Sequence, residues 1–317
     1  PAVARILARH PDLHVIMVGE PSALAAALKK EKLDDHPRLA LIPASEVVAM
    51  DDPVAVALRQ KKDSSMRVAI NMVKEGRAQA AVSAGNTGAL MAVSRFVLKT
   101  LPGVDRPAIC TAIPTASGHC HMLDLGANVD SEPAHLLQFA LMGQAVVRAV
   151  DGVEQPRVAL LNIGEEDIKG NEQIKEAAGL LREADDLNYV GFVEGNGIFA
   201  GEADVVVCDG FVGNVSLKTM EGVAKMIGNM LREEIKQSWL RKLCGLFALP
   251  VLVGLKKRMD PDHYNGASLV GLRGVVVKSH GGTSKEGFAC ALEVAQLEAR
   301  RNVPSLISDA LSQASAD

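Results

Sequence analysis

The stretch of residues 157–183, RVALLNIGEEDIKGNEQIKEAAGLLRE, decides the fold class of this chain. Its apolar run at 158–163 predicts a buried β-strand, and residues 172–183 predict a helix. A polar turn that contains glycine separates the two. β-rich runs that end at similar turns recur as AAVSA, MLDL, DVVVCD and GVVVKS. Strands that alternate with helices predict βαβ units and an α/β fold with a mostly parallel sheet.

Five glycine-containing turns follow these strand-like runs. Parallel strands bring their carboxyl ends to one edge of a sheet, where α/β proteins bind ligands. Glycine lets the backbone approach an anion closely, and a following helix offers free N–H groups. We therefore expect a composite phosphate-type site at one edge of the sheet, built from the turns SAGNTG (83–88), DLGAN (124–128), NIGEE (162–166), DGFVGN (209–214) and KSHGG (278–282).

The composition argues against several classes of partner. Apolar residues make up 48% of the 317 residues and aromatic residues only 3%, so the core must be aliphatic, as in a buried parallel sheet. Few aromatic side chains and a net charge of −4 argue against stacking on bases and against binding a duplex, so we expect no nucleic-acid partner. Five scattered cysteines without a C-x-x-C pair fit a reducing cytosol.

Apolar periodicity, together with proline and glycine punctuation, predicts the remaining elements. We expect strands at 14–18, 39–43, 80–83, 108–113, 119–125, 158–163, 189–193, 205–208 and 275–279. We expect helices at 1–9, 21–30, 54–59, 65–75, 87–99, 133–150, 172–183, 215–235 and 285–301. The polar tail at 305–317 is expected to fray. Residues 1–317 are expected to form a single α/β catalytic domain, with a long helix and an apolar hook inserted at 215–265.

The first turn could bind an anion through its backbone. Gly85 permits a positive φ, and Asn86 or Thr87 could cap the helix that follows. The free amides of this turn, which ends at Gly88, could then hold a phosphate. The alternative is an ordinary tight turn between a strand and a helix.

The third turn continues to Asn171, and this loop of residues 162–171, NIGEEDIKGN, carries a lysine among carboxylates. Lys169 could clamp an anion after the buried strand, with Glu165 or Glu166 holding its charge in place. The alternative is a solvated, charged loop, which is the commoner meaning of such a run.

The fourth and fifth turns also place polar side chains at strand ends. Asn214 lies near the predicted N-cap of the next helix, and Lys218 follows one helical turn later; the alternative is capping by Asn214 with Lys218 exposed. In the fifth turn, Lys278 and His280 form a dense polar group, and His280 could act as a general acid or a hydrogen-bond donor. The alternative there is a turn with an incidental histidine.

His119 and His121 suggest a metal site, because alternation places both on one face of a strand. Two ligands without a nearby third are weak evidence, so a structural role is favoured and no metal is predicted. The chain has no G-x-G-x-x-G fingerprint at a strand end and no phosphate-binding G-x-x-x-x-G-K-[ST] loop. No cofactor is expected.

Residues 238–258, SWLRKLCGLFALPVLVGLKKR, break the α/β pattern. The apolar run at 243–255 is too short to span a bilayer, which takes about 20 apolar residues, and Pro250 would break a helix in its middle. One interpretation is a helical hairpin buried in a dimer interface. The other is an apolar hook that dips into an anionic membrane surface, because Arg241 and Lys242 precede it and Lys256, Lys257 and Arg258 follow it.

Several of these segments together resemble a known family. They are SSMRVAINMVKEGRAQAAVSAGNTGALM, LDLGANVD, RVALLNIGEEDIKGNEQIKEA, DVVVCDGFVGNVSLKTMEG and NGASLVGLRGVVVKSHGG. This series resembles the PlsX-type bacterial phosphate acyltransferases of phospholipid synthesis, over residues 12 to 303. The family's usual first strand and glycine- and aspartate-rich turn have no counterpart in this sequence, so we expect them to be missing from its start.

The resemblance implies a fold and a reaction. The fold would be a three-layer α/β/α sandwich with a Rossmann-like sheet, related to the phosphotransacylases, with a projecting helical hairpin. The reaction would join inorganic phosphate to the acyl group of acyl-[acyl-carrier-protein], giving acyl phosphate and free carrier protein. The resemblance also implies a homodimer that lies in the cytoplasm and attaches peripherally to the inner membrane.

This reaction assigns roles to the turns. Hydrogen phosphate is already a nucleophile, so the enzyme must position it and stabilise the tetrahedral oxyanion. We expect Lys169 and Asn214 to do most of this, with His280 and Lys278 as further candidates. Residues expected to bind phosphate or substrate are Gly85, Asn86, Thr87, Gly88, Asn128, Glu165, Asp209, Gly210, Lys218 and Lys278; those expected to touch lipid are Leu246, Phe247, Leu249 and Val251. Two alternatives are a phosphotransacylase that uses acyl-CoA and a non-catalytic membrane scaffold that binds carrier protein.

Overall fold

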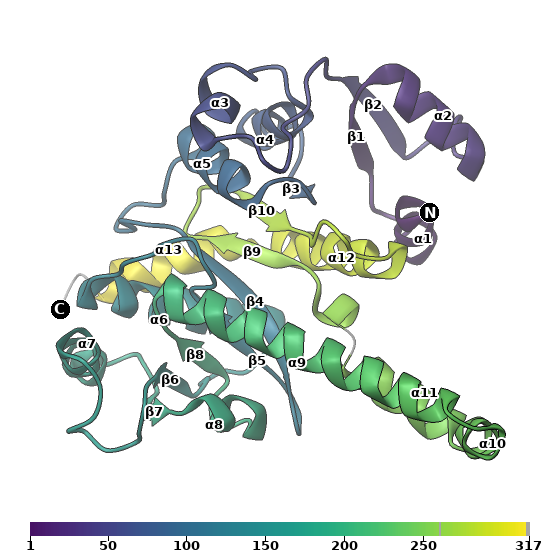
Figure 1. The fold of residues 1–317 in the computed structure, drawn as a ribbon. Helices are drawn as coiled ribbons and strands as arrows, with labels where there is room; N and C mark the ends of the chain where they lie inside the picture. Colours follow the sequence, from purple (N-terminus) through teal and green to yellow (C-terminus); the bar gives the residue numbers. More distant parts are fainter. Residues whose placement is uncertain (260, 315–317) are drawn as a thin grey trace.

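An eight-stranded sheet forms the centre of the molecule (Figure 1). The computed structural model describes residues 1–259 and 261–314, and describes no side chains over 255–261, so the side chains of Lys256, Lys257 and Arg258 lie outside it. The strand order is β3-β10-β9-β4-β5-β8-β6-β7. These strands are β3 (Ala80–Ser83), β4 (Ala108–Thr115), β5 (Gly118–Leu123), β6 (Val158–Leu161), β7 (Tyr189–Val193), β8 (Val205–Val207), β9 (Ala267–Val270) and β10 (Val275–Lys278).

Helices cover both faces of this sheet, which confirms the expected three-layer α/β/α sandwich. One face packs against α6 (Pro133–Val150), α7 (Glu172–Glu183) and α13 (Val303–Ala314). The other packs against α4 (Ser65–Lys74), α5 (Thr87–Leu98) and α8 (Gly195–Ala200). The core is aliphatic as expected: among the buried apolar side chains of the described chain, Phe139 is the one aromatic ring.

Strand direction overturns one expectation. β3 and β10 are parallel, and β5, β8, β6 and β7 are parallel, but β10 to β9, β9 to β4 and β4 to β5 are antiparallel steps. Three reversals make β10 run opposite to β5. The turns at 83–88 and 278–282 therefore leave one edge of the sheet, and the other three turns leave the opposite edge. The idea of one shared edge is wrong, because the strand at 108–113 was predicted without its antiparallel pairing and β9 was not predicted.

A smaller unit precedes the main sheet in the chain. Its two strands, β1 (Val15–Gly19) and β2 (Leu39–Pro43), pair in parallel with each other in a separate sheet. α2 (Pro21–Glu31) packs against it, α1 (Ala2–Arg9) precedes it in the chain, and α3 (Val54–Arg59) follows. α1 contacts α12 (Lys285–Arg301), which packs on β10 of the main sheet.

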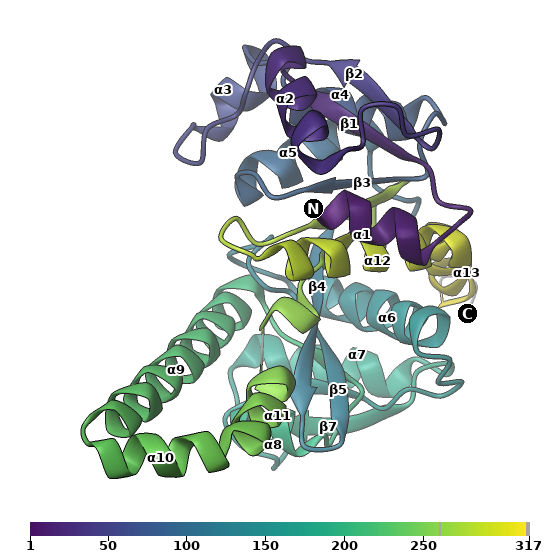
Figure 2. The same ribbon diagram turned by 90° about the vertical axis from the view of Figure 1, so that its right-hand side faces the viewer.

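A three-helix arm projects from the sandwich (Figure 2). It consists of α9 (Gly210–Lys236), α10 (Trp239–Phe247) and α11 (Leu249–Met259), and the 3₁₀ helix Pro261–Tyr264 leads back to β9. The helix breaks just before Pro250, as proline chemistry predicts. Over the described residues no helix is both long enough and apolar enough to cross a membrane.

The structure adds elements that the sequence pattern did not indicate. β9 and the short helix α8 lie where no strand or helix was expected, and α9 begins at Gly210 rather than at residue 215. The tail prediction is wrong for residues 305–314, which lie in α13. Ile307 and Leu311 of that helix are buried against α6, so tertiary packing holds the tail in place.

Candidate active site

The carboxylate of Asp124 organises the turn after β5. It is fully buried and accepts four hydrogen bonds: from the backbone N–H groups of Ile109, Ala127 and Asn128, and from the Asn128 side-chain amide, at 2.8–3.0 Å. Burial raises the pKa of Asp124, and these donors oppose that shift. The Asn128 amide also donates to the Pro107 carbonyl. The Asn128 side-chain amide therefore holds the turn in shape.

The first turn of α9 packs directly onto this turn. The Asp209 carboxylate caps the helix by accepting from the Val212 N–H at 2.8 Å, and the Gly210 N–H donates to the Asn128 carbonyl. A Cβ on Gly210 would lie 2.3 Å from that same carbonyl oxygen, so only glycine fits. Asp209 and Gly210 thus act through the helix start. Asn214 is not an N-cap, because the helix begins before it.

Asn214 lies against Gly126. A Cβ built on Gly126 would lie 3.3 Å from the Asn214 Cβ, and Gly126 has a φ of +112°. Asn214 itself is exposed and has no described hydrogen-bond partner for its side-chain amide. The amide is therefore free to meet a ligand beside the 124–128 turn.

At the opposite edge of the sheet, the 83–88 turn is held by its own side chains. Asn86 is the N-cap of α5: it accepts from the Ala89 N–H at 3.0 Å and donates to the carbonyls of Met50 and Asp52. This confirms capping by Asn86. Gly85 is not among the glycines with positive φ, and instead a Cβ there would meet the Met66 side chain at 3.0 Å.

The 278–282 turn lies beside the 83–88 turn. The Ser279 N–H donates to the Ser83 carbonyl at 2.9 Å. Lys278 is buried and its ammonium donates to the Ser279 carbonyl. Burial lowers the pKa of Lys278, and the charge of Lys218 lowers it further. The two lysines therefore lie near each other, although Lys278 belongs to β10 and Lys218 to α9. His280 is exposed, and its Nδ1 accepts from the Gly282 N–H at 3.1 Å.

The Lys169 turn stands apart from these contacts. Lys169 is exposed and, in the described part of the chain, its ammonium makes no ion pair with Glu165 or Glu166. The expected carboxylate clamp on this lysine is therefore not formed. The loop is shaped by Asn162, whose amide donates to the carbonyls of Gly164 and Lys169. The charge of Lys169 thus remains available to an anion.

A groove of about 590 Å³ runs along the outer face of α5. Its walls are mostly apolar, from Leu58, Met91, Ala92, Phe96, Ile109 and Ala127. Thr87 and Gly88 at the start of α5, and Gly126 across from them, line it as well, while Arg95, Lys99 and Thr100 add polar groups. The groove thus joins the turns of the two opposite edges across one face of the sheet.

Most of the expected site residues fall into three groups. Thr87 and Gly88 line the groove, and Asn214 lies against its Gly126 wall. Lys218 and Lys278 form a second, cationic group, in which Lys218 also pairs with Glu221 at 2.8 Å. Asn86, Asn128, Asp209 and Gly210 build the turns. No described contact joins Lys169, Glu165 or His280 to the groove.

Sequence reasoning missed Asp124 and Asn265 as organising residues. Asn265, which is buried, donates to the Ser279 hydroxyl and accepts from the His280 N–H. Asp124 sits directly before a glycine turn at the end of an apolar run, which is the usual place for a turn-forming carboxylate. Asn265 carries no such local signal.

Comparison with known proteins places this chain in a family. The family model described as fatty acid synthesis protein matches residues 1–306. A phosphate acyltransferase from Alcanivorax borkumensis is 90% identical over 313 residues, which cover 99% of this chain and 93% of that protein. A phosphate acyltransferase from Alkalilimnicola ehrlichii is 58% identical over 311 residues, covering 98% of this chain and 91% of that protein.

Solved structures support the fold. The phosphotransacetylase EutD from Staphylococcus aureus aligns with a TM-score of 0.61 at 17% identity, over 94% of this chain and 91% of that one. A phosphotransacetylase from Streptococcus pyogenes aligns with a TM-score of 0.60 at 19% identity, over 94% and 89%. The α/β/α architecture is therefore that of the phosphotransacetylases, as expected.

Proposed function

We propose that this chain, which belongs to the phosphate acyltransferase family, takes its fatty acyl group from acyl-[acyl-carrier-protein] and supplies acyl phosphate for phospholipid synthesis. The chain is an acyltransferase that uses phosphate as the acceptor. The observation that carries the proposal is the α5 groove, whose walls are mostly apolar and include Gly126, which lies against Asn214 and its free amide. An acyl chain fits the apolar walls, and a thioester fits the polar end.

The chemistry at that end needs no covalent intermediate on the protein. A phosphate oxygen attacks the thioester carbonyl carbon, the tetrahedral oxyanion forms, and the C–S bond then breaks to release the carrier thiol. We assign Asn214 to donate a hydrogen bond to the oxyanion, because its amide is exposed and uncommitted. Preorganised donors of this kind account for a large part of the barrier reduction in acyl transfer.

Cations supply the phosphate-binding part of the proposal. Lys169 lies on the loop after β6, its ammonium makes no ion pair with any described residue, and we assign it to neutralise phosphate or the developing oxyanion. Lys218 and Lys278 are mutually repulsive, since the charge of Lys218 lowers the pKa of Lys278. An anion bound near both would relieve that repulsion. His280, two residues after Lys278, remains a further candidate for hydrogen bonding to the anion.

Basic groups beside the groove suit an acidic carrier protein. Arg95 and Lys99 line the groove, and Phe96 lies between two cations: the Arg67 guanidinium is 4.9 Å and the Lys99 ammonium 5.0 Å from its ring centroid. One guanidinium nitrogen of Arg67 is buried and has no hydrogen-bond partner in the described chain. Such an orphaned donor is costly unless a ligand satisfies it.

The arm suits two further partners that the family resemblance implies. Along α9, exposed apolar residues recur at helical spacing, namely Val223, Met226, Ile227, Met230 and Leu231. A second copy of this chain would cover that stripe and form a homodimer. At the tip, Leu246, Phe247, Leu249 and Val251 are 51–79% exposed, and α10 buries no residue. We assign this tip to the anionic surface of the inner membrane, from the cytoplasmic side.

The identity of the acyl donor distinguishes this proposal from a phosphotransacylase that uses acyl-CoA. The test supplies the enzyme with matched acyl chains on carrier protein and on coenzyme A, and measures phosphate-dependent thioester loss from each. We expect a much higher kcat/KM with the carrier protein. Equal or better use of acyl-CoA would overturn the assignment of the donor. Binding of carrier protein without any thioester loss would favour the scaffold alternative.

A further inference from the structure

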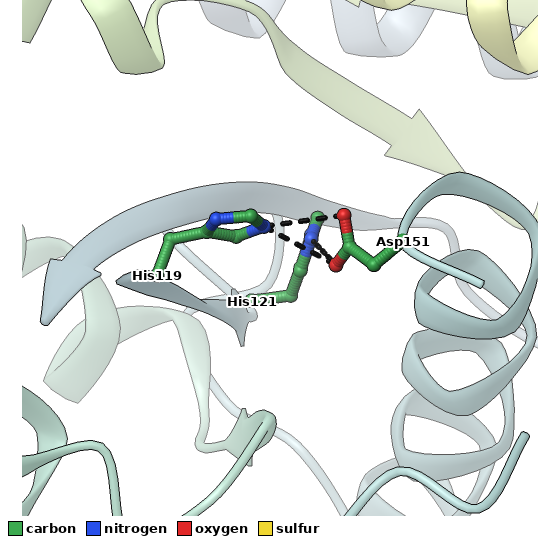
Figure 3. Close-up of side chains that lie close together, drawn as sticks. All are labelled: His119, His121 and Asp151. Carbon is green, nitrogen blue, oxygen red and sulfur yellow. Dashed lines mark hydrogen bonds and ion pairs between the residues drawn. The ribbon is translucent and has the colours of Figure 1, made fainter. Parts of the chain in front are cut away.

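Three potential metal ligands converge at the end of the sheet away from the 124–128 turn (Figure 3). His119 and His121 lie two residues apart on one face of β5, and Asp151 is the C-cap residue of α6, which packs on that face. The carboxylate lies 3.2 Å from His119 Nε2 and 2.9 Å from His121 Nε2. Asp151 is therefore the third ligand that the sequence pattern lacked.

The spacing of these atoms fits one small cation. One donor atom from each residue lies within 4.8 Å of the other two. Zinc bonds of about 2.0–2.1 Å in a tetrahedral site place ligand atoms about 3.3 Å apart. The distances from the two Nε2 atoms to the Asp151 carboxylate are already close to this value. To bind one ion, only the two imidazoles must move closer to each other. His119 has a side chain that is 38% exposed and can rotate to do so.

The position of Asp151 favours a positive charge beside its carboxylate. A carboxylate at a helix C-terminus faces the negative end of the helix dipole, which is unfavourable. Asp204 lies close enough to repel Asp151. Arg157 does not offset this repulsion, because its guanidinium is already paired with the Asp204 carboxylate at 2.9 Å. A divalent cation between Asp151 and the histidines would answer both effects.

The environment of His121 supports the tautomer that a metal requires. Its side chain is 10% exposed, and its Nδ1 lies 3.8 Å from the buried Cys110 thiol. If Nδ1 carries the proton and points at the sulfur, Nε2 keeps its lone pair for a metal. Ligating histidines commonly have the second nitrogen fixed by such a neighbour.

We propose that His119, His121 and Asp151 bind one divalent transition-metal ion of the zinc class. Two imidazoles and one carboxylate suit Zn²⁺, Co²⁺ or Ni²⁺ and not Mg²⁺ or Ca²⁺, which prefer oxygen ligands. The half-exposed His119 leaves the fourth position open to water. The ion ties β5 to the end of α6. Since the turn at 124–128 leaves the other end of β5, the site stabilises the sandwich and takes no part in acyl transfer.

The test is a Zn²⁺ titration of the full chain by calorimetry near neutral pH, after removal of metal with a chelator. Cys244→Ser serves as the background, because Cys244 is an exposed thiol that could bind zinc by itself. His119→Ala and Asp151→Asn remove one ligand each. His14→Ala, an exposed histidine before β1, is the matched control.

We expect one Zn²⁺ per chain in the background protein and with His14→Ala, and an affinity at least about tenfold weaker in each ligand variant. Added Zn²⁺ should raise the Tm of the background protein and not that of His119→Ala, while acyl transfer rates stay unchanged in both. His119→Ala keeps the test valid even if Asp151→Asn folds poorly, because His119 is partly exposed. No stoichiometric binding, or equal binding by His119→Ala, would overturn the proposal and leave a histidine–aspartate hydrogen-bond cluster.

Discussion

Gly213 of α9 lies so close to Asp124 that a Cβ at position 213 would stand 1.8 Å from the Asp124 carbonyl oxygen. The first turn of α9 therefore rests directly on the turn after β5. This contact sets the position of Asn214 against Gly126. It therefore also positions the Asn214 amide, to which we assign the hydrogen bond to the oxyanion.

Replacing Gly213 with alanine should displace the start of α9. Overpacking of this kind costs about 1–3 kcal/mol, and here the obstacle is backbone that cannot rotate away. We expect Gly213→Ala to lower both Tm and kcat. Gly222→Ala on the same helix is the control, since nothing lies within 4 Å of its Cβ, and it should stabilise by about 0.5–1 kcal/mol. Thermal unfolding of the two variants checks this; similar Tm values would contradict the close packing.

Lys169→Ala and Asn214→Ala should each slow acyl phosphate formation by about 10²–10³-fold, which is the usual loss for one oxyanion donor. The measurement is steady-state turnover with acyl-[acyl-carrier-protein] and saturating phosphate. Lys30→Ala on α2 and Asn229→Ala on α9 are matched controls, because both side chains are exposed and outside the proposed site. Turnover near the wild-type rate in both site variants would remove these residues from the mechanism.

Glu298 makes the stability of the protein depend on pH. It is buried, accepts a hydrogen bond from the Ser268 hydroxyl, and burial raises its pKa from 4.5 to about 7. The folded state therefore holds a proton that the unfolded state loses first. The stabilising contribution is complete below 4.5 and lost as pH rises to about 7, in total about 3 kcal/mol. The neighbouring Cys110 thiol does not titrate there, because burial raises its pKa well above 9.

Glu298→Gln tests this pH dependence, since glutamine keeps an acceptor for Ser268 and has no proton to lose. We expect the free energy of unfolding of the wild type to fall between these two pH values, and the fall to be smaller in the variant. Denaturant unfolding at several pH values measures both. The same slope in the two proteins would contradict a raised pKa.

Phe247→Asp together with Val251→Asp should release the protein from anionic vesicles. These side chains are 79% and 73% exposed at the tip of the arm, so the change should leave Tm unaltered. Flotation with anionic and neutral vesicles measures the binding. Val47→Asp, at a residue that is 66% exposed elsewhere, is the control and should float like the wild type. Unchanged flotation of the double variant would favour a dimer interface at the tip.

Local patterns in the sequence were enough to predict most elements, because strands such as 80–83 and helices such as 133–150 have clear apolar periodicity between turn residues. They could not predict that β9 and β4 reverse the sheet, because strand direction depends on pairing between residues as far apart as Cys110 and Ser268. The two-edged arrangement of the turns follows from that pairing alone.

The roles of site residues were harder to predict than their positions. The sequence suggested Asn214 as a helix cap, whereas the structure shows that α9 begins at Gly210 and that the Asp209 carboxylate caps it by accepting from the Val212 N–H. Similarly, His119 and His121 gave two ligands on one strand, while the third, Asp151, comes from the end of a helix 30 residues beyond His121. Such convergence is tertiary and has no local signal.

The central claim is that phosphate is the acceptor for an acyl group delivered on carrier protein. Its most direct test is incubation of the purified chain with acyl-[acyl-carrier-protein] and isotopically labelled phosphate, with free carrier thiol and labelled acyl phosphate measured together. We expect both products to appear in equal amounts, and neither to form without phosphate. Thiol release that does not depend on phosphate, or that yields no labelled acyl phosphate, would contradict the claim.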